Sequence, residues 1–215
     1  MENPGALDLA AINQQLRHQH PADIVKWAVA LNKKTVVTTN FRPFEAVILH
    51  LCQQADPHMD VLWIDSGYNT KATYLCAEKI IQQLALNLHV FNPLMTAARR
   101  DALMDGIPDI DSPLHEEFTR QVKLEPFSRA MKQFQPEVWL TAIRKDQTAF
   151  RQNLDIVTQD ETGLVKVAPL FYWTEVDMEG YLYEHKLPNE DDYYDPTKVL
   201  GDRECGLHTR SPVAS

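Results

Sequence analysis

Short apolar runs alternate with longer amphipathic stretches along most of the chain. Three runs, Thr35–Thr39, Val61–Asp65 and Leu88–Phe91, have the β-branched or apolar character of buried strands. The stretches after the first two, Phe44–Gln54 and Thr70–Leu84, carry apolar residues at the spacing of one helix face. This alternation predicts strand–helix units and therefore a mostly parallel sheet with right-handed crossovers.

Further elements flank these units. Two short amphipathic helices, Leu7–His18 and Pro21–Leu31, are expected to pack against the edge of the core. Residues 92–135 are polar and helical in pattern, and residues 105–113, with two prolines and a glycine, interrupt them as a loop. We expect most of the charge in this part of the chain to lie on solvated surface.

The last third of the chain predicts a strand, a hairpin and a helix. Glu137–Ala142 has the character of a fourth strand, and Leu154–Thr158 with Leu164–Ala168 reads as a hairpin. Thr174–His185 is a helix that begins with a capping box. The expected fold class is therefore α/β: a single domain with a mostly parallel, twisted sheet and helices on both faces.

Composition and charge narrow the class of function. Of the 215 residues 44% are hydrophobic and 24% are charged, which is ordinary for a globular domain. The net charge of −9 argues against broad nucleic-acid binding, although a few local cations can still hold a small anion. The chain lacks an apolar run of about 18 residues and an N-terminal signal pattern, so we expect no membrane span and no export.

The three cysteines, Cys52, Cys76 and Cys205, are far apart and odd in number. This pattern indicates neither a disulfide framework nor a CxxC metal site. We therefore expect a reducing, cytoplasmic setting and no metal site.

The loops after the first, second and fourth predicted strands carry the candidate chemistry. In a parallel sheet such loops meet at one edge, which is where α/β proteins bind ligands. The three loops are Thr38–Pro43, Asp65–Tyr68 and Arg144–Arg151. We expect a nucleotide-sized, partly cationic cleft where they meet.

The first of these loops has features of an anion site. Asn40 and Pro43 fit the start of a helix, whose free N–H groups and dipole favour a negative ligand. Arg42 would add a full positive charge. A plain turn without a ligand is the alternative, because the loop has no glycine-rich cradle.

The other two loops each leave two interpretations open. Asp65 follows the second strand and could bind ribose hydroxyls or cap the next helix, which we expect to begin with Asn69 or Thr70 as its N-cap. Arg144 and Arg151 follow the fourth strand, where their donors suit phosphate or sulfate. An ordinary salt-bridged loop is the alternative for these arginines.

A single cysteine near the end of the chain is the candidate nucleophile. It lies in Arg203-Glu204-Cys205-Gly206-Leu207-His208, seven residues from the C-terminus. Arg203, protonated His208 and Arg210 would favour the thiolate, which is the nucleophilic form. A thiol on an arm suits delivery of sulfur chemistry to a substrate bound elsewhere; a tail with an incidental cysteine is the alternative.

Together these segments resemble the sulfonucleotide reductases, the 3′-phosphoadenylyl-sulfate and adenylyl-sulfate reductases, which are relatives of the PP-loop ATP pyrophosphatases. The resemblance runs from about Lys34 to His208. Its most specific part is the Arg-Glu-Cys-Gly-Leu-His stretch, which looks like the catalytic cysteine motif of that family. Weaker similarities follow in the family's order at residues 40–51, 64–68, 123–126, 142–151 and 166–170.

The resemblance implies an adenine nucleotide alpha hydrolase-like fold and a set of site residues. Cys205 would be the catalytic nucleophile. The cations of the set would neutralise phosphate and sulfate charge, and Asp65 and Tyr68 would face the nucleoside. The residues implied in substrate binding are Thr38, Thr39, Asn40, Phe41, Arg42, Asp65, Ser66, Gly67, Tyr68, Lys123, Arg144, Gln147, Arg151, Arg203 and His208.

The resemblance also implies three parts within the single domain. Residues 1–33 would form N-terminal helices packed on the domain. Residues 34–188 would bind the nucleotide, and residues 189–215 would form the C-terminal arm with the catalytic cysteine. A homodimer is compatible with the sequence.

The implied reaction is reductive. The Cys205 thiolate would attack the terminal sulfur of the sulfonucleotide, displace the adenosine phosphate and become a Cys S-sulfonate. A dithiol of thioredoxin or glutaredoxin would then release sulfite by attack on the sulfur–sulfur bond.

The same resemblance bears on cofactors. The adenylyl-sulfate type of enzyme holds an iron–sulfur cluster on four cysteines. This chain has three cysteines, with Phe118 and Thr119 where the cysteine pair would fall, so we expect no such cluster. That favours 3′-phosphoadenylyl sulfate as substrate, with sulfite and adenosine 3′,5′-bisphosphate as products.

The chain departs from the family pattern in three places. Arg42 stands where the phosphate loop usually has Gly, Asn40 stands where Ser is common, and the segment before Cys205 is short. One alternative is therefore a diverged PP-loop protein with different sulfur-transfer or adenylation chemistry, although the Ser-Gly-Gly loop of ATP pyrophosphatases is absent. A catalytically silent nucleotide- or partner-binding protein is the other.

Overall fold

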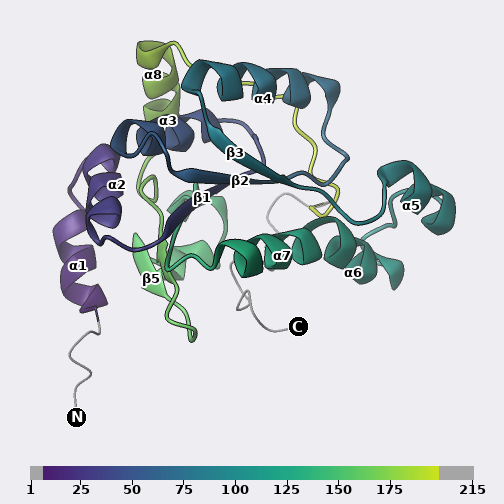
Figure 1. Cartoon of the computed structure of the whole chain (residues 1–215), viewed down its shortest axis with the longest axis horizontal. Helices are drawn as coiled ribbons and strands as arrows, with labels where there is room; N and C mark the ends of the chain where they lie inside the picture. The colour runs from purple at the N-terminus through teal and green to yellow at the C-terminus, as the bar shows by residue number, and fades with distance from the viewer. Residues whose placement is uncertain (1–6, 199–215) are drawn as a thin grey trace.

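The apolar residues of the central strands face two ways, and this dictates a layered fold. Alternate residues of a strand point to opposite faces, so Val36 and Leu62 pack into one buried cluster while Val37 and Val61 pack into another. A sheet that is apolar on both faces must be covered on both. The computed structural model, which describes residues 7–198, shows a central sheet between two helical layers (Figure 1).

The sheet that residues 7–198 form has six strands in the order β3-β2-β1-β4-β6-β5. Neighbouring strands pair in parallel, except that β5 and β6 form an antiparallel hairpin. The predicted fold class and the predicted hairpin are confirmed. The strands are β1 (Thr35–Thr39), β2 (Asp60–Ile64), β3 (Asn87–Phe91), β4 (Val138–Leu140), β5 (Val157–Gln159) and β6 (Val165–Val167).

One face of the sheet is covered by helices that contribute to the larger apolar cluster (Figure 1). These helices come from the first half of the chain and from its end. They are α1 (Leu9–Leu16), α2 (Pro21–Ala30), α3 (Glu45–Ala55), α4 (Lys71–Leu84) and α8 (Glu175–His185).

The other face is covered mainly by α7, whose Phe127, Ala130 and Phe134 pack against Leu62 and Trp139 of the sheet. A π-helical turn joins α7 to α6, and α5 lies beyond them at one end of the molecule (Figure 1). The bounds are α5 (Ala97–Met104), α6 (Leu114–Thr119), the π-helical turn (Arg120–Leu124) and α7 (Glu125–Phe134).

The strand order brings the three candidate loops together, as predicted. β1 lies between β2 and β4, and it is parallel to both. Thr39 pairs with Trp63 of β2, and Val37 pairs with Leu140 of β4, so the carboxyl ends of the three strands share one edge. The loops that follow these strands therefore border one region of the molecule.

One expectation about the chain is corrected and another is confirmed. α3 begins at Glu45, after Phe44 in the left-handed conformation, so Pro43 does not lie in the first helical turn and Asn40 does not cap it. Most of the charge of residues 92–135 lies at the surface, as expected, with two exceptions: Arg100 is fully buried and Lys123 is 6% exposed.

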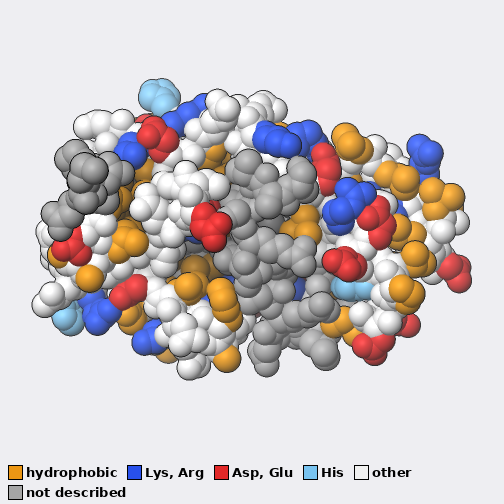
Figure 2. Space-filling model, turned by 90° about the horizontal axis from the view of Figure 1, so that it is seen from below, with side chains coloured by type: hydrophobic (Ala, Val, Ile, Leu, Met, Phe, Trp, Pro, Cys, Tyr) orange, Lys and Arg blue, Asp and Glu red, His pale blue; other side chains and the backbone are white. Residues whose placement is uncertain are grey.

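The surface carries mixed charge on the face shown in Figure 2, where Lys and Arg side chains lie among Asp and Glu. Apolar side chains gather at the end that carries α5 and α6 (Figure 2); exposed residues there include Leu94, Leu103 and Leu114. None of the helices described between residues 7 and 198 has the length and apolar character needed to traverse a lipid bilayer.

Candidate active site

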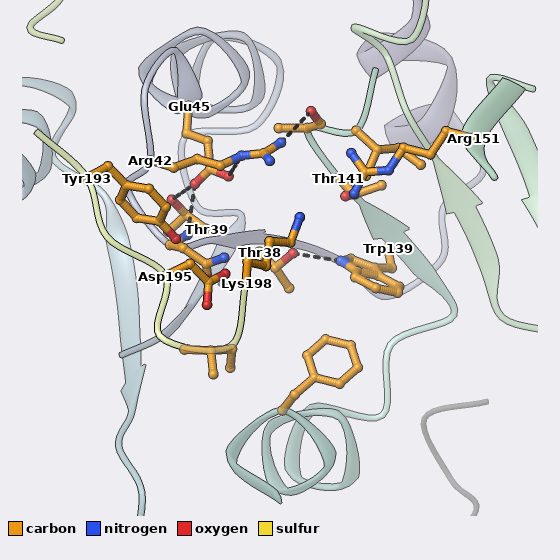
Figure 3. A pocket seen from close by; sticks show the side chains of 15 residues that line it. Thr38, Thr39, Arg42, Glu45, Trp139, Thr141, Arg151, Tyr193, Asp195 and Lys198 are labelled. Atoms are coloured by element: carbon orange, nitrogen blue, oxygen red, sulfur yellow. Dashed lines mark hydrogen bonds and ion pairs between the residues drawn. The ribbon is translucent and has the colours of Figure 1, made fainter. Parts of the chain in front are cut away.

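The carboxyl ends of β1 and β4 border a cavity of about 80 Å³ (Figure 3). Five of the predicted site residues line it: Thr38, Thr39, Asn40, Arg42 and Arg151. A smaller adjoining hollow, which shares Asn40 with the cavity, is lined by two more, Ser66 and Lys123. The cavity and the hollow therefore bring together parts of all three candidate loops.

Glu45 organises the loop after β1. The Thr39 hydroxyl and the Asn40 backbone N–H both donate to Glu45 Oε2, at 2.7 and 2.8 Å. Arg42 Nε donates to Glu45 Oε1 at 2.9 Å, and Arg42 Nη2 donates to the Ala142 carbonyl at 3.2 Å. The guanidinium of Arg42 is thus held between α3 and the loop after β4 (Figure 3).

This loop turns without glycine. Phe41 and Phe44 adopt positive φ angles of 53° and 70°, on either side of Arg42. Phe41 packs edge-on against Trp63 in the core, with ring centroids 4.8 Å apart, so its side chain is buried rather than part of the cavity wall. The Phe44 N–H donates to Asn189 Oδ1 at 2.8 Å. Tertiary contacts thus hold a geometry that elsewhere favours glycine.

The carboxylate of Asp65 accepts several hydrogen bonds within and around the loop after β2. Its Oδ1 accepts hydrogen bonds from the Gly67 N–H at 2.9 Å, Asn69 Nδ2 at 3.2 Å and the Tyr74 hydroxyl at 2.8 Å. Its Oδ2 accepts from Asn92 Nδ2 at 3.1 Å. The carboxylate therefore serves the loop itself.

The helix after this loop is capped by another residue. The Thr70 side chain accepts from the Thr73 N–H at 3.0 Å, so Thr70 rather than Asp65 or Asn69 is the N-cap of α4. The capping interpretation of Asp65 is therefore wrong.

Tyr68 lies in the same loop but faces α5. Its hydroxyl donates to Asp101 Oδ1 at 2.6 Å, and its ring lies 5.9 Å from the guanidinium of Arg100. Burial, followed by the hydrogen bond to Asp101, raises the pKa of Tyr68. Neither Tyr68 nor Gly67 lines the cavity or the adjoining hollow.

The loop after β4 holds two buried arginines. Arg151, 2% exposed, lines the cavity, and its Nη1 donates to Gln147 Oε1. The guanidinium of Arg144 lies over the ring of Phe44, 6.0 Å from its centroid, and pairs with Glu175 at 3.0 Å. Its buried Nη1 has no hydrogen-bond partner among the described residues. The salt-bridged alternative thus describes Arg144.

Lys123 is presented by the π-helical turn. Pro126 lacks an N–H and would clash with the carbonyl of Val122 in a regular α-helix, and the wider turn accommodates it. Lys123 Nζ donates to Asp195 Oδ2 at 2.6 Å and to Thr197 Oγ1 at 3.1 Å. Lys123 thus points to the hollow beside the cavity.

The C-terminal part of the described chain closes the site. Tyr193, Asp195 and Lys198 line the cavity, and Tyr193 and Asp195 lie on the side away from Trp139 and Arg151 (Figure 3). Burial acts to raise the pKa of Asp195, but the charge of Lys123 and the hydrogen bonds from Lys123 and Thr197 outweigh it and lower that pKa. Asp195 is therefore a carboxylate at neutral pH.

Three predicted site residues, Arg203, Cys205 and His208, lie outside the described residues. The other two cysteines are unsuited to act as nucleophiles, because burial raises the pKa of both Cys52 and Cys76. Within residues 7–198 there is no cluster of three or more His, Cys, Asp or Glu side chains that could hold a metal ion.

Several residues of the site were not predicted: Glu45, Trp139, Thr141, Tyr193, Asp195 and Lys198. Glu45 had a detectable signal, because it follows Arg42 by three residues. Asp195 had none, because 72 positions separate it from Lys123 and no local pattern connects them.

Comparisons with known proteins identify relatives of this chain. The model of the phosphoadenosine phosphosulfate reductase domain family matches residues 34–207. A phosphoadenosine 5′-phosphosulfate reductase from Synechococcus sp. is 35% identical over 184 residues, which cover 84% of this chain and 78% of that protein. A protein of the same name from Synechocystis sp. is 34% identical over 186 residues, which cover 85% and 74%.

A solved structure shares the fold. The phosphoadenylyl-sulfate reductase from Candida auris, in complex with phosphate, superimposes with a TM-score of 0.71 at 23% identity. The match covers 86% of this chain and 90% of that one. The matched family segment spans most of the chain and includes Cys205 and all three candidate loops, and so the chain belongs to the phosphoadenosine phosphosulfate reductase domain family.

Proposed function

We propose that the chain reduces 3′-phosphoadenylyl sulfate to sulfite and adenosine 3′,5′-bisphosphate. The observation that carries the proposal is the family match over residues 34–207, because that segment contains both the cleft and the motif around Cys205. Two relatives that bear this activity in their names are 35% and 34% identical to the chain.

The first step is a sulfonyl transfer. The Cys205 thiolate attacks the sulfur of the terminal sulfo group, and the bond between that sulfur and the bridging oxygen breaks. The electron pair of this bond leaves with adenosine 3′,5′-bisphosphate. The enzyme then carries a Cys S-sulfonate, and no electron has yet been taken from a reductant.

The second step needs a dithiol of the thioredoxin or glutaredoxin class. One of its thiolates attacks the Cys205 sulfur and expels sulfite, which forms a mixed disulfide. Its second thiol then resolves this disulfide, so the dithiol is oxidised and Cys205 is returned as a thiol. Such a reductant belongs to a reducing compartment such as the cytoplasm.

The cations of the cleft suit the substrate's negative charge. Arg42, Lys123 and Arg151 border the cavity or the adjoining hollow, where they stabilise the anionic groups and the charge that develops on the leaving oxygen. Arg144 is nearly buried and pairs with Glu175, so we assign it the support of the arginine loop. Thr38, Thr39 and Asn40 offer polar groups along the same wall.

The test compares two cysteine variants. Cys205→Ser is expected to lose sulfite release from 3′-phosphoadenylyl sulfate and reduced thioredoxin by at least about 1,000-fold, while it still binds adenosine 3′,5′-bisphosphate. Cys76→Ser is the matched control and should keep its activity, because this thiol lies on α4, away from the cavity lining. Sulfite release by the Cys205→Ser protein would contradict the mechanism.

The test also separates the alternative chemistry. A diverged PP-loop protein would bind the adenine nucleotide but release no sulfite from either sulfonucleotide. The wild-type protein should release sulfite from 3′-phosphoadenylyl sulfate, measured with a sulfite-specific dye. Binding without sulfite would overturn the proposed reaction.

A further inference from the structure

The carboxylate of Asp195 already forms an ion pair with Lys123, one of the cations of the site. Lys123 Nζ lies 2.6 Å from Asp195 Oδ2, and the two side chains are 7% and 12% exposed. Thr197 completes the arrangement, because its hydroxyl accepts from Lys123 at 3.1 Å and donates to Asp195 Oδ1 at 2.7 Å. At 2.6 Å the contact leaves no space for a substrate oxygen between the two charges.

The segment that carries Asp195 is docked across the mouth of the site. Near its start, Asn189 Oδ1 accepts from the Phe44 N–H at the beginning of α3 at 2.8 Å. In its middle, the Asp192 carbonyl accepts from the hydroxyls of Thr70 and Thr73, each at 2.8 Å. Residues 189–198, which we call the terminal segment, therefore bridge α3, α4 and the π-helical turn.

The local charges favour an exchange. Asp195 borders both the cavity and the hollow, so any ligand with phosphate or sulfo groups that fills them brings negative charge against this carboxylate. An ammonium binds a phosphate or sulfo oxygen as readily as a carboxylate oxygen. Two anions on one ammonium repel each other, so a phosphate or sulfo group that binds Lys123 weakens the hold of Lys123 on Asp195.

We infer that Asp195 competes with the anionic group of the substrate for Lys123, so that nucleotide binding must release the terminal segment from the site. The inference rests on the proposed function, because it takes the ligand to be a phosphorylated adenine nucleotide. It adds a selectivity element: only a ligand that supplies an oxyanion to Lys123 recovers the interaction that the chain gives up. An uncharged nucleoside cannot open the site in this way.

A second role for Asp195 predicts the opposite sign. If the carboxylate only orients Lys123 for the substrate, its removal should weaken nucleotide binding. If it competes with the substrate, its removal should strengthen binding. The two roles are therefore separated by the direction of one affinity change.

The experiment measures the affinity for adenosine 3′,5′-bisphosphate by isothermal titration calorimetry. Asp195→Asn keeps the shape of the side chain and removes the charge, and it should bind about tenfold tighter than the wild type, as expected for the loss of a close competing charge. Asp192→Asn is the matched control: it makes the same charge change in the same segment, but the residue is anchored through its carbonyl, so affinity should stay within about twofold.

Each outcome has a defined reading. Equal or weaker binding by Asp195→Asn, with clear binding by the wild type, would overturn the inference and leave the proposed function intact. A wild type that binds no bisphosphate would overturn both. Equal tightening by both variants would show a general charge effect and would overturn the specific role of Asp195.

A second readout needs no substitution. Hydrogen exchange of residues 192–198 should become faster when the bisphosphate binds to the wild-type protein, because the terminal segment leaves Lys123. Adenosine at the same concentration should leave the exchange unchanged. Slower exchange of this segment with the bisphosphate would contradict the inference.

Discussion

The loop after β2 and the terminal segment each place one carboxylate at the same edge of the sheet, but the two acids have different partners. Asp65 accepts four hydrogen bonds from uncharged donors, three of them from residues 67–74. Asp195 is held by the charge of Lys123. The difference teaches that a carboxylate satisfied by its own scaffold is structural, whereas one that neutralises a cation of the cleft is exchangeable.

The largest expected effect tests the role of Lys123 in the reaction. Lys123→Met should lower kcat/KM for 3′-phosphoadenylyl sulfate about 100- to 1,000-fold, because a charge stabiliser is lost at the reacting groups. The double variant Lys123→Met/Asp195→Asn should regain the docking of the terminal segment, measured by hydrogen exchange, without regaining activity. Restored activity in the double variant would contradict the role of Lys123.

The next effect tests the structural role of the Asp65 carboxylate. Asp65→Asn should lower the free energy of unfolding by about 2–3 kcal/mol. The NH2 group of Asn cannot accept the hydrogen bonds that one carboxylate oxygen of Asp65 accepts, so partly buried donors would lose their acceptor. Asp195→Asn should lower it by about 1 kcal/mol or less, because the terminal segment can open without the rest of the domain. Urea denaturation measures the unfolding free energy of both variants. Equal losses would contradict the different roles given to Asp65 and Asp195.

A smaller effect tests one hydrogen-bond donor to Asp65, the hydroxyl of Tyr74. Burial, followed by the hydrogen bond to Asp65, raises the pKa of Tyr74 to about 12, so its hydroxyl donates over the ordinary pH range. Tyr74→Phe should therefore cost about 1 kcal/mol of unfolding free energy. Tyr183→Phe is the control, because Tyr183 is 89% exposed, and it should change the value by less than about 0.5 kcal/mol.

The smallest effect is a pH dependence. The pKa of Asp195 lies below its ordinary value of 3.8, so the carboxylate stabilises the folded state above that pH, and the contribution is lost as the pH falls through the lowered value. The difference in unfolding free energy between wild type and Asp195→Asn, about 1 kcal/mol or less at pH 6, should therefore vanish on acidification. A difference that grows on acidification would contradict the lowered pKa.

The sequence predicted the layers of the fold better than the details of the site. The strand runs and the loops after them were recognisable because burial on both faces leaves an apolar signature, as in Val61–Ile64. Tyr193 and Asp195 were missed because their roles arise from contacts between segments that are distant in sequence. Glu45 was missed although its spacing from Arg42 gave a local signal, because its role depends on a loop geometry without glycine. The burial of Arg100 was also missed, since one of its partners, Gln121, lies 21 positions away in the sequence.

The central claim is that the thiol of Cys205 takes the sulfo group from a sulfonucleotide bound at the carboxyl edge of the sheet. The most direct measurement is the intact mass of the purified protein after incubation with 3′-phosphoadenylyl sulfate and no reductant, followed by peptide mapping. The account predicts a gain of one sulfonate group, located on Cys205 and removed by reduced thioredoxin. An unchanged mass, or a sulfonate on Cys52 or Cys76, would contradict it.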